Sequence, residues 1–120
     1  MIRKIRLLLL LQVLWPCAAA IAAERPVIYT VNYPLQYFAQ RIAGDHADVV
    51  LPVPPDVDPA FWQPDAAAIA AFQRADLILL NGAGYAKWLD MVSLPRRKLV
   101  DTSAGFSDRY LAVQGGTSHS

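Results

Sequence analysis

The residues of this 120-residue chain that could do chemistry do not form a catalytic set. A nucleophile needs an adjacent general base, most often histidine, and the sequence has only His46 and His119. His46 follows Gly44 in an expected turn between a helix and a strand, where a solvent-exposed polar residue is ordinary. We therefore expect a binding protein and no enzyme.

Two short polar segments remain as candidates for ligand contact. Asn81-Gly82-Ala83-Gly84 lacks the complete G-x-G-x-x-G pattern of a nucleotide loop, and a turn with positive φ explains its glycines without a phosphate. Asp101-Thr102-Ser103 has the side chains either to cap a loop or to contact a ligand, and the capping role is the one we expect.

The segment from 54 to 64, PPDVDPAFWQP, is the most informative loop. Its prolines restrict the backbone, and Phe61 and Trp62 bring large apolar surface into a region that should be a loop. Two interpretations stay open: these side chains cap the hydrophobic core, or they form a wall of a binding cleft.

Two apolar periodicities alternate along the chain and predict the elements that position these loops. Strands are expected at 27–31, 48–53, 77–80 and 98–100, and helical faces at 34–42, 68–75 and 85–92. This β-α-β-α-β-α-β order predicts an α/β fold, a single lobe with a four-stranded parallel sheet flanked by helices on both sides. Ligands of such sheets bind at the carboxyl ends of the strands, which is where the loops above fall.

The N-terminus has the three parts of a secretory signal peptide. A basic stretch (Arg3, Lys4, Arg6) precedes the apolar run 7–15 and the small residues 18–23. We expect residues 1–23 to be removed near Ala22 or Ala23 and the remainder to be periplasmic. Cys17, the only cysteine, is an unfavourable lipid attachment site because Pro16 stands where a small residue belongs.

Charge argues against a nucleic-acid partner. The whole chain has 11 basic and 10 acidic residues, and removing the three basic residues of the signal changes the net charge from +1 to −2. Nucleic-acid binding would need a basic patch, and Arg96-Arg97-Lys98 is the only basic cluster beyond the signal. We interpret it as a solvated turn.

Several motifs in order resemble the zinc/manganese solute-binding proteins of ABC importers. They are TVNYPL at 30–35, IAGD at 42–45, Asp58-Pro59 with Pro64 beyond, ADLILLNGAGY at 75–85, and Trp88-Leu89. The resemblance covers about residues 27 to 113. It implies one half of a two-lobed metal-receptor fold, with the metal held between two α/β lobes and delivered to an ABC permease in the inner membrane.

On this resemblance, residues 24–113 form the N-terminal lobe, and 114–120 are the disordered start of a His-rich loop. The expected metal residues are Asp58 and His119, but the position that usually provides the first histidine ligand is Ala60. A methyl group cannot coordinate a metal, and Gln63 stands where relatives often have a glutamate. The expected cleft wall comprises Asn32, Phe61, Trp62, Gln63, Asn81, Gly82 and Asp101.

The sequence therefore predicts a partial periplasmic receptor for uptake of zinc or manganese that binds the metal weakly or not at all by itself. The alternative is an envelope adhesin or interaction module without metal transport. Because the second lobe is not recognisable in the sequence, we also expect exposed apolar surface and self-association.

Overall fold

The computed structural model describes residues 24–111. The predicted signal peptide, with Cys17, and the predicted start of a His-rich loop, with His119, lie outside the described residues. No helix within the described range is long and apolar enough to cross a membrane.

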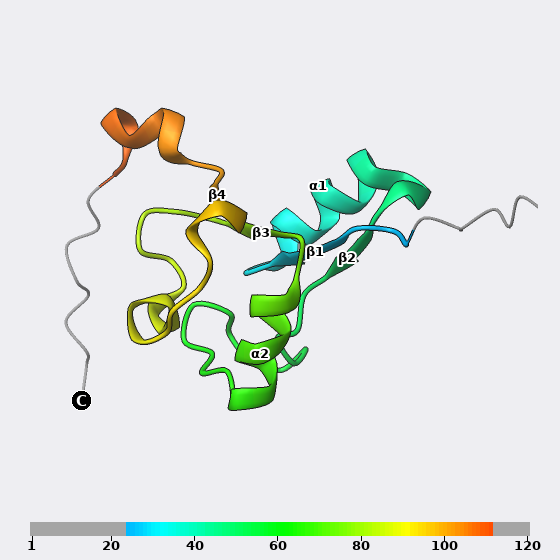
Figure 1. The fold of residues 1–120 in the computed structure, drawn as a ribbon. Helices are drawn as coiled ribbons and strands as arrows, with labels where there is room; N and C mark the ends of the chain where they lie inside the picture. Colours follow the sequence, from blue (N-terminus) through cyan, green and yellow to red (C-terminus); the bar gives the residue numbers. More distant parts are fainter. Residues whose placement is uncertain (1–23, 112–120) are drawn as a thin grey trace, which may run out of the picture.

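A four-stranded parallel sheet forms the centre of the fold (Figure 1). Its strands are β1 (Val27–Thr30), β2 (Asp48–Val50), β3 (Leu77–Leu80) and β4 (Leu99–Asp101). They are arranged in the order β2-β1-β3-β4, and every neighbouring pair is parallel. The predicted sheet is thereby confirmed, and the carboxyl ends of all four strands meet at one edge.

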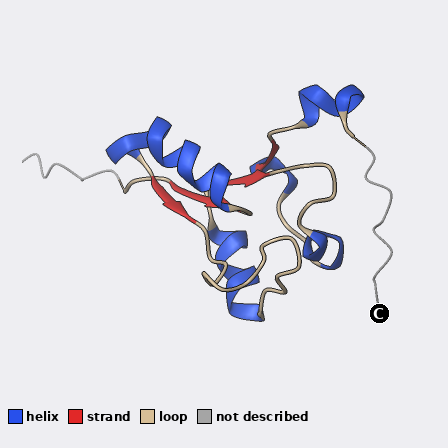
Figure 2. Cartoon of the chain, turned by 180° about the vertical axis from the view of Figure 1, so that it is seen from behind, coloured by secondary structure: helices blue, strands red, loops and turns tan. Residues whose placement is uncertain are grey.

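Two α-helices cover opposite faces of this sheet, α1 (Tyr33–Ala43) and α2 (Ala66–Arg74) (Figures 1 and 2). The Asn32 side chain caps the start of α1, and Pro34 lies in its first turn. Gly44, with a φ of 53° and a ψ of −126°, ends the helix in a positive-φ conformation that glycine adopts without strain. The capping residue, proline and glycine thus set the limits of α1 largely where the sequence predicts them.

The buried face of α1 differs from the predicted one. Ala39 is buried and Leu35 is half-buried, but Phe38 is 60 % and Ile42 86 % exposed. The helix contacts β1 and β2 and is rotated so that the small side chain of Ala39 lies over the sheet. At 100° per residue, Phe38 lies about 100° and Ile42 about 60° from Ala39 on the same side of the helix, and both are therefore left on its exposed flank.

The predicted third helix is the clearest error in the sequence-based elements. Residues 85–92 form no α-helix, and only a short 3-10 helix, Lys87–Met91, is present. The prediction that the apolar side chains of this segment face the core is nevertheless correct, because Trp88 is buried and Leu89 and Val92 pack against the core. A periodic apolar pattern of two turns does not guarantee an α-helix, because so short a segment gains too little from hydrogen bonding.

The second strand is also shorter than predicted, because it ends at Val50 and not at Val53. Pro52 has no N–H group to donate to a neighbouring strand, so pairing stops before it.

The core lies between the sheet and α2 and is built on aromatic contacts. Phe72 packs against Trp88 with ring centroids 4.9 Å apart and against Tyr29 at the same separation. Trp62, from the proline-rich loop, meets Trp88 edge to face at 5.9 Å. Such pairs contribute roughly 0.5–1.5 kcal/mol each beyond the area that they bury, so this cluster anchors the loop from 54 to 64 to the core.

Candidate functional site

At the carboxyl edge of the sheet, a hydrogen bond between two side chains joins the end of β1 to the end of β3. Asn32 Nδ2 donates to Asn81 Oδ1 at 2.9 Å, and Asn32 Oδ1 accepts from the Leu35 N–H group at 3.0 Å. Asn32 is only 4 % exposed. Both polar atoms of its side chain therefore have partners within the protein, and Asn32 shapes the edge without offering a free ligand atom.

Three consecutive residues of the turn after β3 have positive φ values. Gly82, Ala83 and Gly84 have φ values of 75°, 52° and 64°, and the Tyr85 N–H group closes the turn on the Gly82 carbonyl at 3.1 Å. A Cβ atom on Gly82 would collide with the Asp101 carboxylate and the Ser103 hydroxyl. The prediction that these glycines serve positive φ is confirmed, and Gly82 also allows the loops after β3 and β4 to meet.

Asp101, at the end of β4, caps its own loop. Its Oδ1 atom accepts hydrogen bonds from the Ser103 N–H group at 2.9 Å and from the Ser103 hydroxyl at 3.1 Å. The Ser103 hydroxyl also contacts the Tyr110 hydroxyl. Of the two roles considered for this segment, capping is the one that the geometry shows.

The proline-rich loop after β2 is held by tight turns around Asp58. Asp58 Oδ1 accepts from the Ala60 N–H group at 2.9 Å, and the Asp58 carbonyl accepts from the Phe61 N–H group at 3.0 Å. Trp62 is half-buried against the core, whereas Phe61 is 74 % exposed and Gln63 is exposed as well. Trp62 thus caps the core, and Phe61 and Gln63 are available at the surface.

Tyr85 lies close enough to Asp58 for the two to interact electrostatically. Burial raises the pKa of the Tyr85 phenol, and the negative charge of Asp58 raises that pKa further. The phenol therefore stays protonated at neutral pH and offers a cation only a neutral oxygen.

A hollow of about 190 Å³ lies between the ends of β3 and β4. Its lining brings together three residues of the predicted cleft wall, Asn81, Gly82 and Asp101, but none of Phe61, Trp62 and Gln63. Asp90 also lines the hollow. Sequence reasoning missed Asp90 because it lies in the segment that was expected to be an ordinary helix.

A complete metal site is not present among the described residues. No group of three or more His, Cys, Asp and Glu side chains between 24 and 111 could hold an ion. Histidine is absent from the described part of this edge, because His46 lies before β2, at the opposite end of the strands. Zinc in proteins usually takes four N, S or O ligands, so this lobe by itself provides at most part of a coordination sphere.

The fold and this edge define a class of protein: an α/β ligand-binding lobe whose loops meet at the carboxyl ends of parallel strands. Residues 28–120 match the family described as zinc-uptake complex component A, periplasmic (ZnuA). This match covers most of the sequence, and the chain belongs to that family. The expected family and fold class are thereby confirmed.

Individual relatives agree with this assignment. The high-affinity zinc uptake system protein ZnuA of Bacillus subtilis is 36 % identical over 62 residues, which are 52 % of this chain and 19 % of that protein. The crystal structure of the metal-dependent lipoprotein YcdH from Bacillus subtilis superimposes with a TM-score of 0.61 and 30 % identity, covering 70 % of this chain and 33 % of that one. The SBP FpvC of Pseudomonas aeruginosa in complex with Ni²⁺ gives a TM-score of 0.62 and 25 % identity, covering 74 % of this chain and 34 % of that one.

These relatives are much longer than the matched segment. The chain spans less than a fifth of the Bacillus zinc-uptake protein and about a third of the two solved structures.

Proposed function

We propose that the described lobe is one wall of a receptor that binds a divalent transition metal, with zinc first, and passes it to an ABC permease. The family match over residues 28–120 carries this proposal. Of the relatives above, one is described as a zinc uptake protein and another as a Ni²⁺ complex, so the fold accommodates more than one metal of this class. None of the three relatives described above is called an adhesin, so the adhesin alternative has no support among them.

In this proposal residues 1–23 are a cleavable signal peptide and residues 24–113 form the lobe in the periplasm. Residues 114–120 begin a His-rich loop. The proposed metal residues are Asp58 and His119, with Phe61, Gln63, Asn81 and Asp101 toward the cleft. The exposure of the Asp58 side chain supports this assignment, and the Ala60 N–H group holds its Oδ1 atom in place.

The chain departs from the resemblance at position 60, where a methyl group replaces the imidazole that relatives are expected to have there. Oxygen donors such as the Asp58 carboxylate suit hard cations better than zinc, which prefers nitrogen and sulfur donors. We therefore expect the full 120-residue chain to bind zinc weakly.

A gain-of-ligand variant tests whether this edge faces the metal. Ala60→His places an imidazole two residues from Asp58, and zinc affinity should rise at least about tenfold, because even groups that only orient ligands change metal affinity roughly 10- to 100-fold. Ala104→His, on an exposed 3-10 helix elsewhere, is the matched control. Isothermal titration calorimetry at neutral pH measures both variants. Equal affinities for the two variants would contradict the proposed site, as would tight, stoichiometric zinc binding by the unaltered chain.

Metal uptake by cells tests the transport role separately. Cells that lack the chain should accumulate less zinc or manganese from metal-depleted medium, and re-expression of the chain should restore uptake. Unchanged uptake of both metals with and without the chain would overturn the transport function whatever the calorimetry shows.

A further inference from the structure

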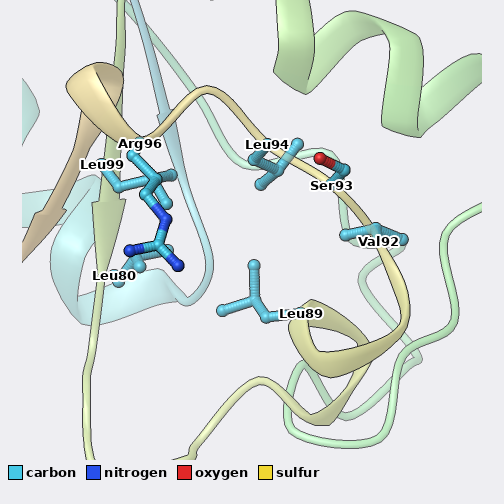
Figure 3. A pocket seen from close by; sticks show the side chains of 7 residues that line it. All are labelled: Leu80, Leu89, Val92, Ser93, Leu94, Arg96 and Leu99. Atoms are coloured by element: carbon cyan, nitrogen blue, oxygen red, sulfur yellow. The ribbon is translucent and has the colours of Figure 1, made fainter.

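A second hollow shares Leu80 and Leu89 with the hollow beside Asp101 and extends toward residues 92–99 (Figure 3). It has a volume of about 290 Å³ and is lined by Leu80, Leu89, Val92, Ser93, Leu94, Arg96 and Leu99. This volume is near the lower end of the roughly 300–1,000 Å³ that is usual for small-molecule sites. Five of the seven lining side chains are aliphatic, so the hollow is built for an apolar group.

The hollow lies beside the segment where the third predicted helix does not form. The 3-10 helix ends at Met91, and Val92 is already extended. Gln73 Nε2, from α2, donates to the Ser93 carbonyl at 3.0 Å and holds this outer wall in place. Pro95 fixes the backbone at the far end of the wall, with a φ of −63°.

Arg96 gives this apolar hollow a single positive charge. Figure 3 shows its side chain among the residues that line the hollow. Within residues 24–111 the only ion pair joins Arg25 and Asp48, so no carboxylate of the described lobe neutralises Arg96. The Ser93 hydroxyl offers a further hydrogen-bond donor in the same lining.

We propose that this hollow binds an aliphatic monocarboxylate of medium length, with its chain among the leucines and its carboxylate on Arg96. Guanidinium and carboxylate pair with matched geometry, and the aliphatic lining stabilises a hydrocarbon chain in proportion to the area that it removes from water. An alcohol or amine of equal length lacks the charge complement, and acetate lacks the apolar part. None of its lining residues is a proposed metal residue.

The test uses octanoate, below the concentration at which it forms micelles, with the full chain followed by heteronuclear NMR. We expect saturable shifts at Leu80, Leu89, Leu94 and Leu99. Arg96→Gln should weaken octanoate binding about three- to tenfold, which corresponds to one hydrogen bond of ordinary strength, because Arg96 is exposed. Arg97→Gln is the matched control, because Arg97 is an exposed neighbour in the same 3-10 helix that does not line the hollow, and it should change affinity less than twofold.

Three results would overturn the proposal: no saturable shifts at the hollow, equal weakening by both arginine variants, or octylammonium binding as well as octanoate. Unchanged circular dichroism of both variants would show that a loss of affinity does not come from unfolding. Since neither arginine belongs to the proposed metal edge, failure here would leave the metal-receptor function standing.

Discussion

Asn32 illustrates how a single side chain at this edge serves two elements at once. It caps α1 through Oδ1 and joins the end of β3 through Nδ2. The sequence placed Asn32 on the cleft wall but did not show that both of its polar atoms have partners within the lobe. Position and availability are separate properties, because a residue can face a cleft while its hydrogen-bonding capacity is already satisfied.

Gly82 is constrained both by its positive φ and by the side chains that approach it closely, and substitutions can separate these two effects. Gly82→Ala introduces a Cβ atom at a φ of 75° and against Asp101 and Ser103, so the free energy of unfolding should fall by about 2–4 kcal/mol. Gly44→Ala meets open space at a φ of 53° and a ψ of −126°, so only the backbone strain, about 1–3 kcal/mol, applies.

Gly105→Ala is the control, because its φ is not in the left-handed region and nothing lies near the new atom. Its stability should stay within about 0.5 kcal/mol of the original chain. Urea denaturation followed by tryptophan fluorescence ranks the three variants. A Gly82→Ala cost no larger than that of Gly44→Ala would show that the loops after β3 and β4 do not meet as described.

Among the elements, helix ends depend on local side chains, whereas helix conformation depends on packing as well. Caps act locally: Asn32 and Gly44 mark α1, and the Asp65 carboxylate accepts from the Ala68 N–H group at 2.7 Å at the start of α2. Whether residues 85–92 form an α-helix depends on how Trp88 fits the core, and tertiary packing decides that fit.

The cap of α2 gives a prediction at this scale. Asp65→Ala leaves the first-turn N–H groups of α2 without their side-chain acceptor, and the free energy of unfolding should fall by about 0.5–2 kcal/mol. Asp65→Asn retains a carbonyl oxygen at the same place and should lose much less. Urea denaturation followed by circular dichroism measures both, and an equal loss in the two variants would mean that the cap is not what stabilises α2.

At the scale of the whole molecule, the lobe exposes several large apolar side chains. Phe38 and Ile42 on α1 are prominent among them, and Phe106 and Leu111 are exposed near the end of the described chain. Exposed apolar surface favours association when it is contiguous, so we expect the chain to self-associate as its concentration rises.

Sedimentation velocity at several concentrations measures this association. The double variant Phe38→Lys with Ile42→Lys should move the monomer–oligomer transition to higher concentration, because charged groups on the flank of α1 oppose its burial. Gln40→Lys adds a charge to the same helix at an already polar exposed position and should have little effect. A concentration-independent monomer for the unaltered chain would refute the prediction.

The α/β class, the four parallel strands, the limits of α1 and the glycines of the left-handed turn could all be predicted from the sequence. These follow from local physical chemistry, because periodicity, caps and positive φ are properties of residues and their near neighbours. Three features could be seen only in the packed fold: Trp62 belongs to the core and Phe61 to the surface, α1 turns Ala39 and not Ile42 toward the sheet, and Asp90 lines a hollow with Asp101. Each of these depends on side chains distant in sequence competing for the same space, and that competition is settled only when the elements pack.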